Sequence, residues 1–395
     1  MNKLFDRKTI TVRPLAERIN KLDFERDRID PETYVPNLTP AAQDSVRQAA
    51  AEIRSARARG APAILAFGAH AIKNGLSPVM VRLMKGGWIS HFATNGAGVI
   101  HDWEFAFQGF SGEDVKRYVG EGQFGIWQET GMYLNLALAV GAYRGLGYGE
   151  SVGAFVAEDG LTLPAPEEFS AAIAAGADAH ADEAALTRAA AAADLKSLLL
   201  RCHVKPGFLR VDHPFKANGL QAAAYTAGVP FTAHPMFGHD IIYTHPLNRG
   251  APIGRAADRD FLAFVDSVSR LEGGVYLSVG SAVMSPMIFE KALSMSRNAA
   301  RKHGAAIEDF SIHVVDLAES AWDWVRDGEP PQDSPAYYLR FCKTFSRMGG
   351  RMSYTSADNR AFLVALLREL ERADRQPRKG AVNTIGANLK NCGKG

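Results

Sequence analysis

The chain has 395 residues, of which 47% are hydrophobic and 22% are charged, and its formal net charge is +2. This composition is typical of a globular protein whose core is large enough to be stable without disulfide bonds or bound metal ions. Because the charge is nearly balanced and no long Lys/Arg run occurs, the sequence gives no indication of nucleic acid or an anionic membrane as a partner.

The cysteines and the N-terminus bear on the compartment. The three cysteines, Cys202, Cys342 and Cys392, are odd in number and widely spaced. This pattern indicates a reducing environment without a disulfide framework or a cysteine-based zinc site. The N-terminus carries charge throughout, has no apolar signal segment, and is followed by no run of about 18 apolar residues. We therefore expect a cytoplasmic protein.

The first 45 residues are polar and irregular, and Pro31 and Pro36 interrupt any helix there. We expect residues 1–45 to form an arm that packs on the body of the protein or on a neighbouring subunit. A helical pattern then runs from Pro40 to near Gly60. The remainder, residues 46–373, is predicted to be a single α/β domain, followed by a polar tail over 374–395 that is loosely held.

Short apolar runs alternate with helical patterns from residue 63 onward. A run at 63–67 ends in Gly68, and a helix over 76–86 begins at Ser77-Pro78. A second run at 89–93 leads into the small residues 94–98 and then into a helix. This alternation predicts a Rossmann-like, three-layer αβα fold with a mostly parallel sheet.

The segment from about 160 to 215 differs from its surroundings because it is rich in alanine and charge. Such a composition favours helix, and the leucines between Leu195 and Leu200 give it a face to bury. We expect a helical insertion on the outside of the sheet. The α/β pattern then resumes, with helices expected over 220–227, 260–271, 286–301 and 359–372 and strands over 229–232, 274–279, 312–316 and 352–354.

Glycines and polar residues follow several of the predicted strands, and these positions meet at the carboxyl edge of a parallel sheet. Glycine lets a ligand approach the backbone, and the next helix offers free N–H groups to an anion. The usual dinucleotide fingerprint, G-x-G-x-x-G opening a helix, is absent. The pattern favours a nucleotide-sized ligand, with tight turns alone as the alternative. The strand ends concerned are 68–70, 95–102, 238–245, 280–282 and 357–358.

Four of these segments resemble, in order and spacing, motifs of the deoxyhypusine synthase family. They are Thr94 to Asp102, Val229 to Asp240, Leu277 to Val283 and Tyr354 to Asn359. The resemblance covers roughly residues 60 to 370, interrupted by the Ala-rich segment. It implies a homotetramer that binds NAD at the carboxyl edge of the sheet and transfers an aminobutyl group from spermidine to a protein lysine through an imine on an enzyme lysine.

The resemblance also implies roles for individual residues. Lys343, eleven residues before Tyr354, is in register with the family's lysine, and a solvated lysine on a helix flank is the alternative. His101 and Asp102 follow the glycine segment, where His101 would do acid/base work. The cofactor would contact Thr94, Asn95, Gly96, Ala97, Gly98, Gly238, Asp240, Gly280, Ser281, Ala282 and Asp358.

This sequence departs from the family's motifs at several positions. Ile100 and His101 replace an acidic pair, and Ser285-Pro286 replaces a Lys-His pair. Losing acids removes groups that hold a cationic polyamine. The prediction is therefore an NAD-dependent transferase that acts on a small amine of the polyamine type by a reaction related to deoxyhypusine synthesis.

Two alternatives remain open at this point. The first is a metal-dependent hydrolase or lyase, because the pairs His101-Asp102 and His239-Asp240 both follow predicted strands. Imidazole and carboxylate are ligands for zinc, iron or manganese, and the candidate set is His70, His101, His239 and Asp240. The second alternative is a non-catalytic ligand-binding relative that kept only the fold.

Overall fold

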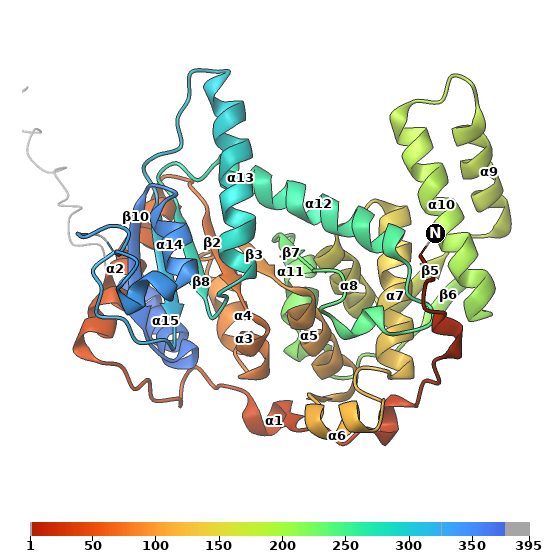
Figure 1. Ribbon diagram of the computed structural model, residues 1–395, viewed down its shortest axis with the longest axis horizontal. Coiled ribbons are helices and arrows are strands. Elements are labelled where there is room, and N and C mark those ends of the chain that lie inside the picture. Colours follow the sequence, from red (N-terminus) through yellow and green to blue (C-terminus); the bar gives the residue numbers. More distant parts are fainter. Residues whose placement is uncertain (1, 325, 376–395) are drawn as a thin grey trace, which may run out of the picture.

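The computed structural model describes residues 2–324 and 326–375, and its centre is a parallel sheet of six strands (Figure 1). Across the sheet the order is β10-β9-β8-β2-β3-β7, and every neighbouring pair is parallel. The predicted fold class is thereby confirmed. The strands are β2 (Ala63–Phe67), β3 (His91–Thr94), β7 (Phe231–Ala233), β8 (Val275–Val279), β9 (Ser311–Asp316) and β10 (Arg351–Ser356).

Helices cover both faces of the sheet, as the residues of β2 show. Leu65 and Phe67 point into one buried cluster, whereas Ile64 and Ala66 point into another. A strand buried on both faces reads as a continuous apolar run, which is how 63–67 reads. The first face is covered by α2 (Pro40–Ala58), α4 (Ser77–Lys85), α5 (Gly96–Gln108) and α15 (Asn359–Arg375), and the second by α12 (Gly250–Ser269), α13 (Met284–Arg301) and α14 (Arg340–Ser346).

Side-chain caps fix where several helices begin. The Thr39 hydroxyl accepts the Ala42 N–H at the start of α2, where Pro40 occupies the first turn. The Asn95 side chain accepts the Gly98 N–H at the start of α5. The expected helix over 260–271 begins ten residues earlier, at Gly250, because Pro252 lies in its first turn, where a missing N–H is tolerated.

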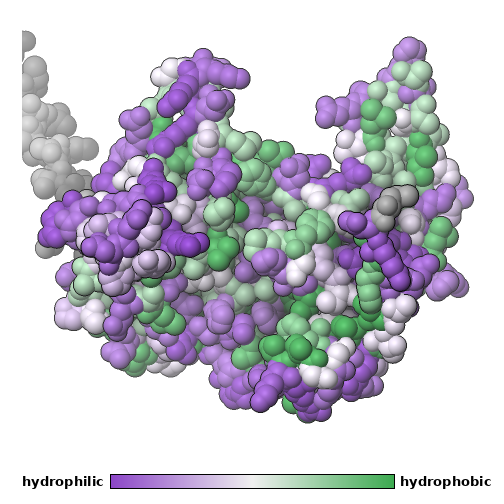
Figure 2. All heavy atoms as spheres, in the orientation of Figure 1, coloured by the Kyte–Doolittle hydropathy of each residue, from purple (hydrophilic) through white to green (hydrophobic). Residues whose placement is uncertain are grey.

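A long segment, residues 109–230, separates α5 from β7. Within it α9 and α10 form a hairpin that stands away from the body (yellow-green in Figure 1), and Leu195 and Leu198 of α10 are buried. Figure 2 shows that the surface is hollowed between this hairpin and α13. The elements of this segment are β4 (Phe110–Ser111), α6 (Val115–Gly120), α7 (Gln128–Arg144), α8 (Tyr148–Ala157), β5 (Gly160–Leu163), α9 (Pro166–Ala177), α10 (Glu183–Cys202), β6 (Gly207–Arg210), η3 (Lys216–Asn218) and α11 (Leu220–Ala227).

The N-terminal arm runs along the body before α2 begins (red in Figure 1). It is fastened by the Leu15 N–H, which donates to Glu129 on α7, and by an ion pair between Arg18 and Glu104 on α5. The arm contains η1 (Arg7–Thr9), η2 (Leu15–Glu17), β1 (Leu22–Asp23) and α1 (Phe24–Asp27), and β1 pairs antiparallel with β4. The remaining short elements are α3 (Ala69–Lys73), η4 (Ile241–Tyr243) and η5 (Pro335–Tyr338).

The structure bears only in part on the expected C-terminal tail and on the expected compartment. Most of the expected tail, residues 376–395 with Cys392, lies outside the described residues. Among the residues that are described, no helix has both the length and the apolar character needed to cross a membrane.

Candidate functional site

The order of the strands places a reversal between β2 and β8. From β2 the chain builds outward through β3 and β7, then returns to β8 on the other side and continues to β9 and β10. In open α/β sheets, ligands bind outside the carboxyl ends of the strands at such a reversal.

Glycines occupy both strand ends at the reversal. A Cβ on Gly68 would lie 2.1 Å from the carbonyl oxygen of Gly280, so the two backbones touch. Gly280 has a φ of +57°, a conformation that favours glycine, and a Cβ there would have only Asn359 Nδ2, at 3.7 Å, within 4 Å. The space beside the Cβ position of Gly280 is therefore open apart from Asn359.

A cavity of about 220 Å³ lies at the carboxyl edge of the sheet, beside the N-terminus of α5. It collects side chains from the N-terminal arm, from α3 and α5, and from the loop after β7. Its polar lining consists of Arg18, Lys73, His101, Glu104, Glu113, His239 and Asp240.

Asp240 is a buried carboxyl group in this cavity. A Cβ on Gly96 would lie 2.1 Å from its Oδ2, so the glycine lets the carboxyl group lie against the start of α5. Its carboxyl group accepts a hydrogen bond from the Ala97 N–H, but Oδ2 has no partner among the described residues. Burial raises the pKa of Asp240 to about 7. Such a carboxyl group exchanges a proton near neutral pH.

Glu104 is held as a carboxylate by several donors. Arg18 contacts both of its oxygens, at 2.7 and 2.8 Å, and the hydroxyls of Ser111 and Thr130 donate to it at 2.6 and 3.0 Å. Burial opposes ionisation of Glu104, but the charge of Arg18 and these hydrogen bonds lower its pKa. With its oxygens occupied in this way, Glu104 positions the arm.

Glu113 is the second carboxyl group with capacity for a ligand. One oxygen accepts the Gly125 N–H at 3.1 Å, and the other accepts Nε1–H of Trp127 at 2.9 Å. Burial raises the pKa of Glu113, and these hydrogen bonds oppose the shift. Each oxygen retains a lone pair for a donor in the cavity.

The two residues of the pair His101-Asp102 point to different places. His101 lines the cavity and its Nδ1 lies 2.7 Å from the Ser111 hydroxyl, and burial lowers its pKa to about 4. Asp102 instead accepts the N–H groups of Leu220 and Gln221, at 2.9 and 3.0 Å, at the start of α11. Consecutive helical residues lie about 100° apart around the axis, which separates them. The geometry therefore gives Asp102 a capping position.

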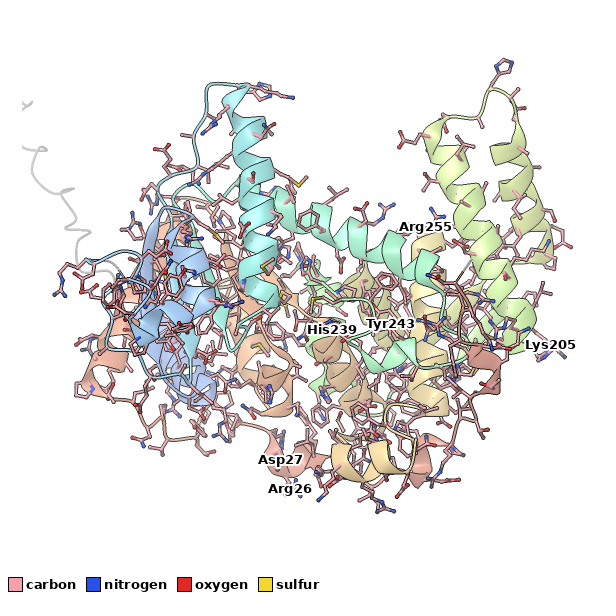
Figure 3. All side chains as sticks on the ribbon, viewed as in Figure 1. Arg26, Asp27, Lys205, His239, Tyr243 and Arg255 are labelled. Carbon is pink, nitrogen blue, oxygen red and sulfur yellow. The ribbon has the colours of Figure 1, made fainter. Side chains whose placement is uncertain are left out.

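The two residues of the pair His239-Asp240 line the same cavity. His239 is exposed. Figure 3 places His239 close to Tyr243, in the middle of the molecule below α12. The other histidines near the strand ends differ, because His70 is exposed on α3 while His234 and His245 are buried.

The expected metal set does not form. Among residues 2–324 and 326–375, no group of three or more His, Cys, Asp or Glu side chains could hold a metal ion. The exposed His70 and His239 lie on separate segments, and Asp240 lies against α5. The metal-dependent alternative therefore has no support from the geometry.

The residues expected to hold the cofactor fall into two groups. Thr94, Gly98 and Asp358 serve the fold. The Thr94 hydroxyl donates to the Phe67 carbonyl, and a Cβ on Gly98 would lie 2.3 Å from that hydroxyl. Asp358 caps α15 and pairs with Arg360. Others lie at the carboxyl edge, where a ligand could reach them. These are Ala97 and Asp240 in the lining of the cavity, Asn95 and Gly96 just before Ala97, the exposed turn glycine Gly238, and Gly280 and Ala282 after β8. Ser281, between the last two, is buried, and its hydroxyl accepts the Ser285 N–H at 3.2 Å.

Lys343 lies apart from the cavity. It is on α14, on the second face of the sheet, and its Nζ is 3.7 Å from the centroid of the Tyr337 ring. A cation over an aromatic face is a common arrangement for a partly exposed lysine. The structure therefore does not bring Lys343 together with His101.

Four polar residues of the cavity were not anticipated from the sequence: Arg18, Lys73, Glu104 and Glu113. Arg18 lies 86 positions before its partner Glu104, and no local pattern relates them. One feature of the sequence pointed to Glu104, which stands between the apolar residues Trp103 and Phe105 in an expected helix.

Comparison with protein-family models and with curated protein sequences found no match. Among solved structures the chain is similar to unliganded AgrE, with a TM-score of 0.44 and 14% identity over 86% of this chain and 34% of AgrE. It is also similar to ArgZ, an arginine dihydrolase from the ornithine-ammonia cycle in cyanobacteria (TM-score 0.39, 12% identity, 83% of this chain and 32% of ArgZ). The chain thus spans about a third of the length of these proteins.

Two further solved structures are similar at the same level. One is AgrE in a ternary complex with ornithine and NAD⁺, with a TM-score of 0.40 and 12% identity over 86% of this chain and 34% of AgrE. The other is a LOR/SDH protein from Methanococcus maripaludis S2 (TM-score 0.40, 13% identity, 88% of this chain and 74% of that protein). Similarity of this degree bears on the fold alone.

These comparisons overturn the resemblance to deoxyhypusine synthase. The similar structures are AgrE, ArgZ and a LOR/SDH protein, which belong to a different fold family. Short glycine-containing strand ends recur in many parallel sheets, since the sheet edge requires them wherever backbones approach. Four such segments in order were therefore insufficient to identify the family.

Proposed function

We propose that this protein is an NAD-dependent enzyme acting on a small amine, with Asp240 as the group that accepts a proton from the substrate. The observation that carries the proposal is Asp240, which lines a cavity at the carboxyl edge of the sheet and whose buried Oδ2 has no partner among the described residues. A carboxyl group with a pKa of about 7 is suited to general acid/base catalysis at neutral pH.

The open space beside Gly280, at the reversal between β2 and β8, is in the position where a dinucleotide binds on such a sheet. A Cβ at Gly280 would project into otherwise open space beside Asn359, which is the space that a pyrophosphate or ribose would need. The backbone of Gly68, Gly280 and Ser281 would hold the cofactor there. When bound, NAD would supply an acceptor for the hydride of the substrate. The acidic residue that commonly binds a ribose is absent, because Asn95 follows the second strand.

The charges in the cavity favour an amine as the substrate. Arg18 neutralises Glu104, which leaves Asp240 and Glu113 as the carboxyl groups able to receive an ammonium group. Lys73 and His239 on the rim could contact an anionic end of the same molecule. A small amine with a carboxylate or another acceptor would satisfy both sets of groups.

Asp240 would act before the carbon centre reacts. Its carboxylate takes one proton from the substrate ammonium, so the free amine can donate its lone pair to the adjacent carbon as that carbon loses hydride. Glu113 orients the amine through its free lone pairs. The apolar wall of Ile100, Val115 and Phe124 limits the access of water to the reacting groups.

The first experiment is a calorimetric titration of NAD into the wild-type protein and into Gly280→Leu. We expect saturable binding to the wild type and at least tenfold weaker binding to the variant. Gly228→Leu is the matched control, because Gly228 also has a positive φ, +65°, but has nothing within 4 Å of its Cβ position. Equal binding to all three proteins, or none to the wild type, would refute the cofactor assignment.

The second experiment tests the amine. NADH formation is followed with diamines and basic amino acids for the wild type and for Asp240→Asn, with Asp258→Asn as a control on the exposed face of α12. We expect the wild-type rate to rise through an ionisation near pH 7 that Asp240→Asn abolishes. If NAD binds but Asp240→Asn retains the wild-type rate and pH profile, Asp240 is not the proton acceptor.

A further inference from the structure

A second cavity lies at the opposite edge of the sheet, before the strands β9 and β10 begin. Its volume is about 470 Å³, and three segments line it: the end of α13, residues 305–308 and residues 347–350. Figure 2 shows hydrophilic side chains around this end of α13. The cavity is far in the fold from Asp240, because the two lie at opposite ends of the strands.

The lining of this cavity is strongly basic. It contains the guanidinium groups of Arg297, Arg301 and Arg347, against a single carboxylate, Glu308. The C-terminal end of a helix favours cations, which accounts for Arg301 at the end of α13. The same preference applies to Arg347, the C-cap residue of α14, and the two helix ends lie beside each other because the chain folds back.

Two of these arginines are held in place and keep free donors. Arg297 donates from Nε to the Ile307 carbonyl at 3.0 Å and lies 5.8 Å from the Phe310 ring centroid. Arg347 uses Nε and Nη2 on Glu329, at 2.7 and 2.6 Å. Arg301 is exposed, and its guanidinium group has no hydrogen-bond or ion-pair partner among the described residues. Several N–H groups therefore remain for a ligand.

Glycines keep this cavity open. Gly349 and Gly350 both have positive φ, +76° and +75°. A Cβ on Gly349 would lie 3.3 Å from Arg297 Nη2, and one on Gly350 would lie 2.7 Å from Phe310 Cε2. Side chains at either position would crowd the guanidinium group or the ring that supports it.

We propose that this cavity, which we call the arginine cavity (Arg297, Arg301, Arg347, Gly349 and Gly350), binds a small phosphorylated molecule. The planar guanidinium group donates two parallel hydrogen bonds to phosphate oxygens, and three such groups around one volume suit a ligand with more than one negative charge. A volume of about 470 Å³ lies in the range of small-molecule sites. The binding at this cavity is independent of the chemistry at Asp240.

Inorganic pyrophosphate is the probe for this proposal. Calorimetry on the full chain should show saturable binding with one site per chain, weakened about tenfold or more by Arg301→Ala and further by Arg301→Ala with Arg347→Ala. Both arginines are exposed, so the variants should retain the wild-type circular dichroism. Lys205→Ala is the control, because it removes one exposed positive charge at the far right of Figure 3, and it should leave the affinity unchanged.

Three results would overturn the proposal. The first is the absence of saturable pyrophosphate binding at low ionic strength. The second is equal weakening by Lys205→Ala, which would mean that net charge alone attracts the anion. The third is displacement of pyrophosphate by a short glutamate peptide of equal or higher affinity, which would make an acidic protein segment the occupant.

Discussion

At the scale of single residues, the position of the Asp240 side chain depends on Gly96. The carboxyl group of Asp240 lies against the first turn of α5 only because residue 96 has no Cβ. The Ala97 N–H and the positive end of the helix favour its charged form, but burial outweighs them and raises the pKa to about 7. Small changes at residue 96 should therefore alter the ionisation of Asp240.

Gly96→Ala is the sharpest substitution at this scale. The new methyl group would lie 2.1 Å from Asp240 Oδ2, so we expect Asp240 to be displaced and the protein to be destabilised by about 1–3 kcal/mol. Gly254→Ala on α12 is the matched control, since nothing lies within 4 Å of its Cβ position, and it should stabilise by up to about 1 kcal/mol. Urea unfolding of both variants measures the difference. Equal effects would show that Gly96 does not fix Asp240.

At the scale of elements, the N-terminal arm is joined to the body by a buried charge pair. Arg18 and Glu104 each expose 1% of their side chains. Removing one partner of a buried pair leaves an uncompensated charge, which commonly costs about 3–5 kcal/mol. The same pair forms one wall of the cavity that contains Asp240. The arm therefore contributes to the site as well as to stability.

Glu104→Gln should lower the free energy of unfolding by about 3–5 kcal/mol and expose the arm to proteolysis before the body unfolds. Glu17→Gln is the comparison, because it breaks the exposed pair between Arg13 and Glu17 and should cost at most about 1 kcal/mol. Denaturant unfolding and limited trypsin digestion test both. Similar losses for the two variants would mean that the buried pair does not hold the arm.

The α9–α10 hairpin has one buried side and one exposed side. Leu195 of α10 is fully buried, whereas Leu186 on the same helix is 52% exposed. We expect Leu195→Ala to destabilise the protein by about 2–5 kcal/mol and Leu186→Ala by no more than about 0.5 kcal/mol. Thermal unfolding compares them. A loss for Leu186→Ala as large as that for Leu195→Ala would indicate that another surface covers the outer side of the hairpin.

At the scale of the whole molecule, buried ionisable groups set the dependence of stability on pH. Burial lowers the pKa of five histidines among the described residues to about 3 or 4, so the unfolded chain binds protons below about pH 6.5 that the folded chain does not. Burial also raises the pKa of Asp240 to about 7 and of Asp260 to about 8, so the unfolded chain releases protons that the folded chain keeps. The five histidines are His91, His101, His213, His234 and His245.

Stability should therefore be greatest near pH 6.5. It falls toward acid because the histidines become protonated only on unfolding, and it falls from pH 6.5 to 8 because the two aspartates ionise only on unfolding. Asp240→Asn should remove the pH dependence that Asp240 contributes between about pH 4 and pH 7, which is about one proton and about 4 kcal/mol in total. Unfolding free energies from pH 4 to 9, with Asp258→Asn as the control, measure this. A slope unchanged in Asp240→Asn would contradict the raised pKa.

Much of the fold followed from local patterns in the sequence. The continuous apolar run at 63–67 and the mostly apolar run at 274–279 became β2 and β8 almost residue for residue, because a strand covered on both faces is mostly apolar along its length. Thr39-Pro40 started α2, as a cap and a first-turn proline do. The helices α7 and α8 were not anticipated, because they are buried over much of their surface and show no amphipathic stripe.

The sequence by itself determined the alternation of strands and helices, the parallel sheet and the carboxyl edge as the place to look for a site, since these depend on interactions between near neighbours in the chain. Only the tertiary structure decided which polar residues meet there. It turned Asp102 toward α11, brought Arg18 from the arm to Glu104, and set Asp240 against Gly96. It also gathered three arginines from α13 and α14 into one cavity. Contacts between distant segments depend on how the helices pack over the sheet, and that packing leaves no pattern in the local sequence.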